Sequence, residues 1–508
     1  MGIRRALAAT TFAALLGGAA QADEPLSAIG WLSDVVATPV VVAPPKLPQE
    51  RAVDDVSTNA TPAVVTTTTL GAPNRDAVGL RPASATGLPS NFWGTTPSKT
   101  LATALADLRA DLPPPLSELL RTILLAELKP PLDSGPDATL FRARVDTLLN
   151  IGAIEQAKAL LDRAGPDSPA LFRRWFDVSL LTGEEQAACK SMLRAPDLSP
   201  TYPARIFCLA RSGDWDAAVV TLNSAKSLGV ISDTEDALLA RFLDPELFEG
   251  EPPVAVPDRV TPLNFRMHEA IGEPLSQFTL PNAFAFASLS ENVGWKPRLT
   301  AAERLTRTGA IPASRLLAIY SERKRAASGG VWDRVEAVQA LEAALDAGDA
   351  EKIAQALPKA SRAMRRAGLE SALAAQFGDR LSGQTSHAAT RLAMLSPAYE
   401  EAITDATPPL WHGVAKGNAA LIETALQSDL TPLQAAIASA FTATGPAPDD
   451  KSAIDAGNLG LATLQAIARI EAGAGADPKA VEAALRTLRH LGFLDAARRT
   501  ALLLLVTS

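Results

Sequence analysis

Histidine is the residue type in this chain best suited to metal binding or proton transfer, and its spacing argues against both. His268 opens the stretch His268-Glu269-Ala270-Ile271-Gly272, which begins like the H-E-x-x-H signature of zinc proteases. That signature needs a second histidine on the same helix face to hold zinc. Gly272 stands at that position, and the other histidines are scattered along the chain. The sequence therefore predicts no metal site.

The sequence also lacks a complete motif for a catalytic nucleophile. Ser321 and Lys324 have the S-x-x-K spacing of penicillin-binding proteins, and the stretches 290–292 and 307–309 faintly resemble the two accompanying motifs. The order of these motifs is wrong, however, and no strand is predicted to carry the third. The sequence has neither a G-x-S-x-G elbow nor a phosphate-binding G-x-x-x-x-G-K-S/T loop. We predict no catalytic and no cofactor-binding residues, and we expect that the protein is not an enzyme.

The N-terminus has the features of an export signal. Arg4 and Arg5 are followed by an apolar run over 6–18 and by Ala20-Gln21-Ala22, a cleavage site of the A-x-A type. Neither this run nor any later one reaches the roughly 20 apolar residues of a spanning helix. We expect cleavage after Ala22, a periplasmic location and no membrane span.

Cys189 and Cys208 are the only two cysteines in the chain. In an oxidising compartment such a pair indicates one disulfide. Both residues fall on helices that the repeat pattern described below makes antiparallel neighbours. The alternative is a redox-active pair, but the C-x-x-C spacing typical of that chemistry is missing.

The net charge of −8 limits the classes of partner. An acidic chain is a poor match for nucleic acid and for an anionic membrane surface. The net charge does not exclude proteins, peptides or glycan strands as ligands. No nucleic acid is therefore expected among the partners.

A glycine recurs at almost equal intervals in the first half of the chain. Gly152, Gly183 and Gly213 lie 31 and 30 residues apart, each between two stretches with helical apolar periodicity. An alanine pair or a similar small-residue pattern follows each glycine. This period predicts a series of α-helical hairpins with glycine at each helix–helix turn.

The same turn pattern recurs less regularly in the second half, at Gly309, Gly348, Gly417 and Gly492. Glycine is expected to end one helix, and Asp or Asn to cap the next. The apolar residues 501–506 are too few to span a membrane. They predict a buried terminal helix.

These residues resemble the tetratricopeptide-like helical repeat proteins. The resemblance rests on the stretch Gly213-Asp214-Trp215-Asp216-Ala217-Ala218 and its counterparts at 152 and 183. The period of 30 to 31 residues is shorter than the usual 34, and the early Trp-Leu-Gly signature is missing. The resemblance implies an all-α helical-hairpin solenoid, a superhelix that binds partners on a curved surface. The Ala-, Leu- and Arg-rich chain also resembles exported proteins of alphaproteobacteria.

Composition divides the chain into six parts. Prolines and threonines dominate the segment before residue 100, and prolines mark a connection in the middle. The predicted parts are a signal peptide (1–22), a short amphipathic motif (23–36), a disordered linker (37–99), a helical-repeat domain (100–243), a Pro-rich connection (244–262) and a second helical-repeat domain (263–508).

Aromatic residues are few in both helical halves. Trp175, Trp215, Trp295, Trp332 and Trp411 are spread at about one per hairpin. We predict that they fill the core between Ala-rich helices, because a large ring closes gaps that small residues leave.

The motif at 23–36 combines an apolar stripe with a long tether. Ile29, Trp31 and Leu32 are its central apolar residues. One interpretation is helix-in-groove docking on a partner, with Trp31 as the anchor. The other is that the segment packs on the chain's own helices. The sequence favours neither.

These features favour a non-catalytic periplasmic scaffold or adaptor. Its expected partners are proteins of an envelope machine, for cell-wall synthesis or the flagellar motor. The alternative is an enzyme acting on cell-wall glycan, or a glycan-binding protein, with a helical superhelix. Carboxylate pairs such as Glu184-Glu185 are typical of solvated helix faces, which weakens the enzyme alternative.

Overall fold

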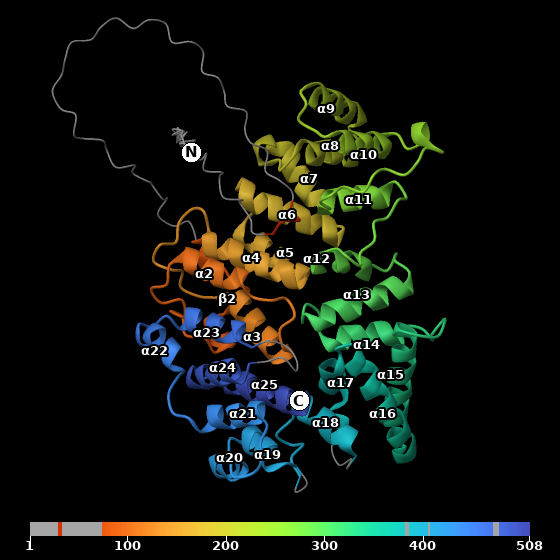
Figure 1. Cartoon of the computed structure of the whole chain (residues 1–508). Helices are drawn as coiled ribbons and strands as arrows, with labels where there is room; N and C mark the ends of the chain where they lie inside the picture. The colour runs from red at the N-terminus through yellow and green to blue at the C-terminus, as the bar shows by residue number, and fades with distance from the viewer. Residues whose placement is uncertain (1–28, 33–73, 382–385, 405–406, 471–476, 508) are drawn as a thin grey trace, which may run out of the picture.

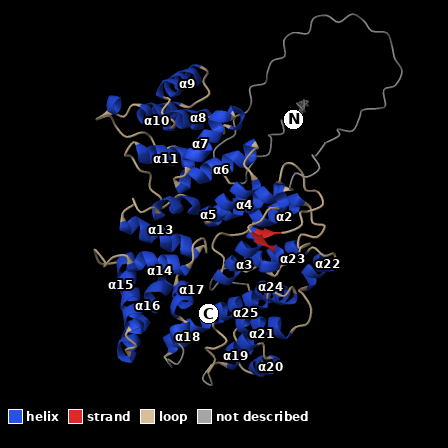
Figure 2. Cartoon of the chain, turned by 180° about the vertical axis from the view of Figure 1, so that it is seen from behind, coloured by secondary structure: helices blue, strands red, loops and turns tan. Residues whose placement is uncertain are grey.

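The structure is a computed structural model, and it describes residues 29–32, 74–381, 386–404, 407–470 and 477–507. Helices α1 to α25 make up most of it, and loops and turns most of the remainder (Figure 1). Within these ranges one sheet occurs, a parallel pairing of β1 (Arg81–Pro82) with β2 (Ala126–Glu127) that sets Arg81 beside Ala126. The predicted all-α class is confirmed, and Figure 2 shows how small the strand contribution is.

The elements before the middle of the chain are short and closely spaced. They are the 3-10 helix η1 (Arg75–Ala77), α1 (Ala83–Thr86), α2 (Ser98–Ala106), α3 (Pro114–Leu125), α4 (Thr139–Ile151), α5 (Ile154–Ala164), α6 (Pro169–Thr182), α7 (Glu185–Arg194), η2 (Pro196–Leu198), α8 (Tyr202–Arg211), α9 (Trp215–Ser227), α10 (Asp233–Leu243), η3 (Glu246–Phe248) and α11 (Pro262–Ala270).

The later elements include the two longest helices, α15 and α16. They are α12 (Asn282–Ala285), η4 (Phe286–Leu289), α13 (Trp295–Arg307), α14 (Ala313–Ser321), α15 (Val331–Asp346), α16 (Ala350–Arg366), α17 (Glu370–Phe377), η5 (Asp379–Leu381), α18 (His387–Leu395), α19 (Pro409–Lys416), α20 (Ala419–Ala425), α21 (Pro432–Thr442), α22 (Pro448–Asp455), α23 (Leu459–Ala468), α24 (Pro478–His490) and α25 (Leu494–Thr507).

The glycine turns lie where the repeat predicts them. Gly152 and Gly183 end α4 and α6 in the left-handed conformation, and Gly213 follows α8 with a φ of 88°. The four glycines of the second half also have positive φ and follow helices α13, α15, α19 and α24. The side chain of Asp214 then caps α9 by accepting a hydrogen bond from the amide of Ala217.

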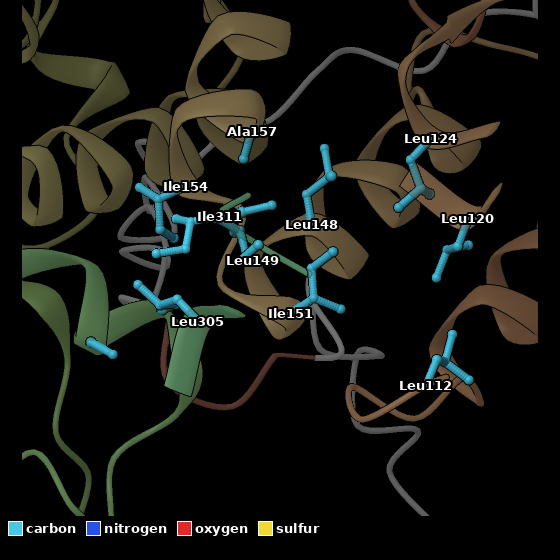
Figure 3. Close-up of a cluster of buried hydrophobic side chains, with 14 of the residues drawn as sticks. Leu112, Leu120, Leu124, Leu148, Leu149, Ile151, Ile154, Ala157, Leu305 and Ile311 are labelled. Atoms are coloured by element: carbon cyan, nitrogen blue, oxygen red, sulfur yellow. The ribbon is translucent and has the colours of Figure 1, made fainter. Parts of the chain in front are cut away.

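Gly152 also lies close to a side chain of a later helix. A Cβ at this position would lie 2.6 Å from Cδ2 of Leu305 on α13. Leu305 and Ile311 pack beside Leu148, Ile151 and Ile154 in the cluster of Figure 3. The turn between α4 and α5 therefore admits a side chain from a hairpin about 150 residues later in the sequence.

The segment 74–99 contradicts part of the linker prediction. Phe92 and Trp93 are each 1% exposed, and the ring of Phe92 lies edge-on to that of Phe493, with 6.4 Å between ring centroids. The backbone oxygen of Phe92 accepts a hydrogen bond of 2.7 Å from the amide of Gly460 on α23. A disordered linker over 74–99 is thus wrong, because two aromatic rings bury enough apolar area to order a segment poor in other large residues. The rest of that prediction, 37–73, lies outside the described residues.

The last helices pack against the first ones. Helix α25 contacts α3, and α23 contacts α2, as the blue and orange helices show in Figure 1. Arg499 of α25 and Glu118 of α3 form an ion pair of 2.6 Å across this junction. Most of the apolar residues over 501–506 are buried in α25, which confirms the predicted terminal helix.

Candidate functional site

Trp31 and Leu32 lie in a groove of the chain's own helical body. Trp31 is 8% exposed and Leu32 is fully buried. The Trp31 ring meets Phe284 of α12 edge-on, with 5.4 Å between centroids, and Phe284 meets Phe265 of α11 in the same way. The ring of Trp31 therefore joins a cluster with two rings from helices in the middle of the chain.

Hydrogen bonds also fix the backbone of residues 29–32. The amide of Leu32 donates to the backbone oxygen of Ile29 at 3.3 Å, which closes a turn. The guanidinium group of Arg259, from the loop before α11, donates to the backbone oxygen of Leu32. A buried carbonyl needs such a partner, since an unmet acceptor costs free energy. The helical body thus holds this segment by both its side chains and its main chain.

A cavity of about 450 Å³ lies beside the segment. Ile29, Gly30 and Trp31 form one wall, and residues of α2 and α4 form most of the rest. The lining from these helices, from α6 and from the loop before α12 consists of Ala102, Leu105, Ala106, Thr139, Arg142, Ala143, Asp146, Thr147, Asn150, Arg174 and Pro281.

Three charged residues line this cavity, Arg142, Asp146 and Arg174. Arg174, whose side chain is 1% exposed, donates from Nε and Nη2 to the two carboxylate oxygens of Asp146, each at 2.7 Å. Burial and the neighbouring Arg174 charge lower the pKa of Arg142 from its ordinary value. The lining of the cavity therefore includes the apolar Trp31, the guanidinium groups of Arg142 and Arg174, and the carboxylate of Asp146. Such a lining suits a peptide with one apolar and one polar face.

The structure brings the three predicted docking residues together, and it places them on the chain's own helices. Docking of the same residues on a partner stays a prediction. Sequence reasoning missed Phe284, Arg259 and the pair of Asp146 with Arg174. A signal for that pair existed, because its two residues are 28 positions apart, close to one repeat, and so fall on neighbouring hairpins.

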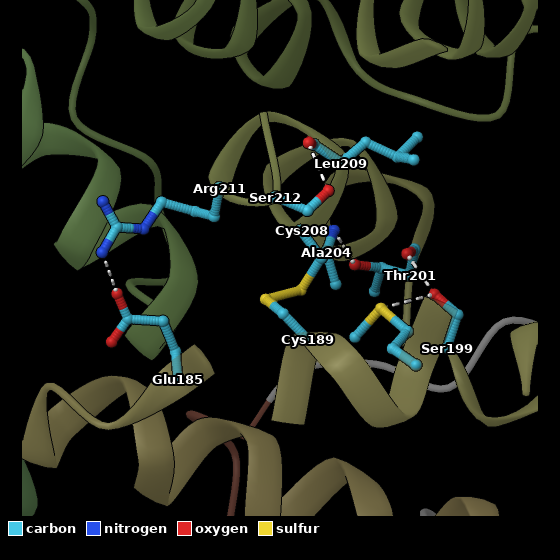
Figure 4. Close-up of a disulfide and its surroundings, with 10 residues drawn as sticks. Glu185, Cys189, Ser199, Thr201, Ala204, Cys208, Leu209, Arg211 and Ser212 are labelled. Atoms are coloured by element: carbon cyan, nitrogen blue, oxygen red, sulfur yellow. Dashed lines mark hydrogen bonds and ion pairs between the residues drawn. A yellow bond between two sulfur atoms is a disulfide. The ribbon is translucent and has the colours of Figure 1, made fainter. Parts of the chain in front are cut away.

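The two cysteines lie at disulfide distance. Their sulfur atoms are 1.98 Å apart and their Cα atoms 5.0 Å apart, between α7 and α8 (Figure 4). Both are buried. Arg211 and Glu185 join the same two helices by an ion pair of 2.8 Å. Reactive cysteines are usually partly exposed, so this environment favours a structural bridge over a redox-active pair.

Neither Ser321 nor His268, the residues considered for chemistry, lines this cavity. Ser321 donates to Glu342 at 3.1 Å. His268 is 1% exposed, and neither ring nitrogen has a hydrogen-bond partner. Burial lowers the pKa of His268 from its ordinary value. In the described part of the chain, no group of three His, Cys, Asp or Glu is placed to hold a metal ion, and no helix is long and apolar enough to cross a membrane.

The tryptophans of the helical halves differ in solvent exposure. Trp175, Trp295 and Trp332 are buried, as predicted for core residues, and Trp411 is half-buried. Trp215 is 47% exposed, so the prediction of a core position is wrong for this residue. It stands at the start of α9, on a side that no other described helix covers.

Comparisons with protein-family models, curated proteins and solved structures find no match for this chain. The tetratricopeptide-like resemblance therefore stays a prediction.

Proposed function

We propose that this protein is a non-catalytic scaffold of the bacterial periplasm, built as a tetratricopeptide-like array of helical hairpins. It binds a protein partner of an envelope machine, for cell-wall synthesis or the flagellar motor. The compartment is supported by the cysteine pair at disulfide distance, because such bridges persist in oxidising compartments. The signal-like residues 1–22 point the same way.

One observation carries the proposal: the groove already holds a short apolar peptide of this chain and has open space beside it. Trp31 and Leu32 fill its apolar end, and the cavity of about 450 Å³ continues past Trp31 toward Asn150. A partner segment entering that space would bury apolar side chains against Trp31 and place polar ones near Asp146 and Arg174.

A photo-crosslinking amino acid at Asn150 tests this directly. Asn150 is exposed and lines the cavity, so a bound partner segment lies within reach of it. We expect crosslinking to one dominant envelope protein in cells. The same amino acid at Lys451, whose side chain is 63% exposed on α22, is the control and should not crosslink to that protein.

A blocking substitution makes the test specific. Asn150→Trp should fill the cavity and abolish capture of the crosslinked partner from envelope extract. Asn292→Trp introduces the same ring at an exposed position elsewhere and should leave capture unchanged. If both variants capture the partner equally well, the groove is not its binding site. Release of soluble muropeptides by the purified chain would instead favour the glycan-acting alternative.

A further inference from the structure

A second cavity, of about 310 Å³, lies where early and late helices of the chain meet. Its lining comes mainly from α3, from α13 and the turn into α14, from α17 and the turn before it, and from α25. Figures 1 and 2 show α3 and α25 beside α14 and α17. This cavity shares no lining residue with the one beside Trp31. We call it the junction cavity.

The junction cavity is positively charged, although the whole chain has a net charge of −8. Its charged lining residues are Glu118, Arg121, Arg307 and Arg499. Arg499 and Glu118 form an ion pair of 2.6 Å, so their charges offset each other. Arg121 and Arg307 form no ion pair with another described residue, and each donates to a backbone oxygen instead. Two positive charges of the lining are therefore uncompensated.

Contacts with the main chain fix the two uncompensated guanidinium groups. Arg121 of α3 donates to the backbone oxygen of Gly309, in the turn before α14. Arg307, the last residue of α13, donates at 3.1 Å to the backbone oxygen of Ala367, in the turn before α17. A guanidinium group has five N–H donors, so one such bond leaves most of them for a ligand.

Two helices begin at the junction cavity. Ala313 and Ser314, the first residues of α14, line it, as do Leu369 and Ser371 at the start of α17. In the part of the chain that the structure describes, no side chain of the N-cap residue caps either helix. The first amides of a helix lack intrahelical partners, and a helix N-terminus favours negative charge. The main chain therefore favours an anion at the same place as the two arginines.

We propose that the junction cavity binds a small organic phosphate monoester. A phosphate monoester has a charge of about −1.5 to −2 at neutral pH, which matches the two uncompensated guanidinium groups. The planar guanidinium group also suits the geometry of phosphate oxygens. Pro115, Ile311 and Leu503 add apolar surface to the lining, and this surface suits the organic part of an ester. The bound ligand contacts helices from both ends of the chain and stabilises their junction.

Isothermal titration calorimetry of the purified protein with three probes, at constant ionic strength, tests the class of ligand. Phenyl phosphate should bind with one-to-one stoichiometry and raise the melting temperature. Inorganic phosphate should bind more weakly because it lacks the apolar ring, and benzoate because it carries a single charge. Benzoate binding as tight as that of phenyl phosphate would overturn the phosphate assignment. Equally tight binding of inorganic phosphate would overturn the ester, and failure of all three probes to bind would overturn the site.

Substitution of the two arginines tests the position of the ligand. Arg121→Met and Arg307→Met should each weaken phenyl phosphate binding by about tenfold or more, because each removes a charge-assisted hydrogen bond. Arg194→Met is the matched control, since Arg194 is exposed at the end of α7 and does not line the cavity. Binding that the two cavity variants retain as fully as Arg194→Met would overturn the proposal.

A charge introduced at Ser314 separates loss of binding from loss of folding. Ser314 is exposed at the second position of α14, where a carboxylate interacts favourably with the helix dipole. Ser314→Asp should therefore keep the fold, which circular dichroism and melting establish, and abolish phenyl phosphate binding by repulsion. Ser314→Asn has a side chain of the same size without the charge and should keep binding. A folded Ser314→Asp variant that binds phenyl phosphate like wild type would contradict the proposed site.

Discussion

The indole ring of Trp31 lies edge-on to the ring of Phe284, with 5.4 Å between their centroids and an interplanar angle of 66°. The two residues are about 250 positions apart in the sequence. This contact fixes the N-terminal segment on helices from the middle of the chain, so the segment contributes to the stability of the body.

Trp31→Ala should therefore lower the melting temperature and reduce the free energy of unfolding by about 3 kcal/mol, as for other large-to-small substitutions in a core. Chemical denaturation of the purified protein measures the difference. Trp215→Ala is the control, because it removes the same ring from a position that is 47% exposed, and its effect on monomer stability should be much smaller. Equal effects of the two substitutions would contradict the burial of Trp31.

The cysteine pair closes a loop of 19 residues between α7 and α8. A double Cys189→Ser, Cys208→Ser variant should lose roughly 3 kcal/mol of stability, since the open chain gains conformational entropy on unfolding. A reducing agent should lower the melting temperature of the wild-type chain and leave the double variant unchanged. Two freely alkylated thiols in the folded protein, purified without reducing agent, would refute the bridge.

His268 should make stability depend on pH. Burial lowers its pKa in the folded chain, while the carboxylate of Glu273 opposes this shift. The unfolded chain then binds the proton first, so stability is lost as the pH falls below about 6.5, the value for an unfolded histidine. Denaturation at neutral and acidic pH should show a smaller loss for His268→Met than for wild type. His387→Met, at an exposed position, should behave as wild type. Equal acid sensitivity of His268→Met and wild type would count against this assignment.

The carboxylate of Glu303 is buried and held by two neighbours. Arg334 donates to its two oxygens at 2.7 and 2.6 Å, and the Tyr320 hydroxyl donates at 2.6 Å. Arg334→Met would leave this carboxylate without its counter-charge and should cost about 3 to 5 kcal/mol. Lys451→Met breaks an exposed pair with Asp455 and should change the unfolding free energy little. If urea denaturation shows similar costs for both, the buried network does not stabilise α13 against α15.

Local features of this fold follow from the sequence by itself. The glycines at 152, 183 and 213 have positive φ because a helix that ends there needs a left-handed residue, and glycine adopts that conformation without strain. Asp214 caps α9 for a similarly local reason. Consecutive hairpins are neighbours in space, so the spacing of Cys189 and Cys208 was enough to predict their proximity.

Packing between distant segments was decided only by the tertiary structure. Trp93 is buried because α23 has a glycine where the ring approaches: a Cβ at Gly460 would lie 2.5 Å from it. Trp31 is buried because Phe284 of α12 packs against its ring. Trp215 is 47% exposed because no helix of the described chain covers it at the start of α9. Periodicity shows that a residue lies on the apolar side of a helix. Burial also requires a second surface, and that surface comes from residues hundreds of positions away.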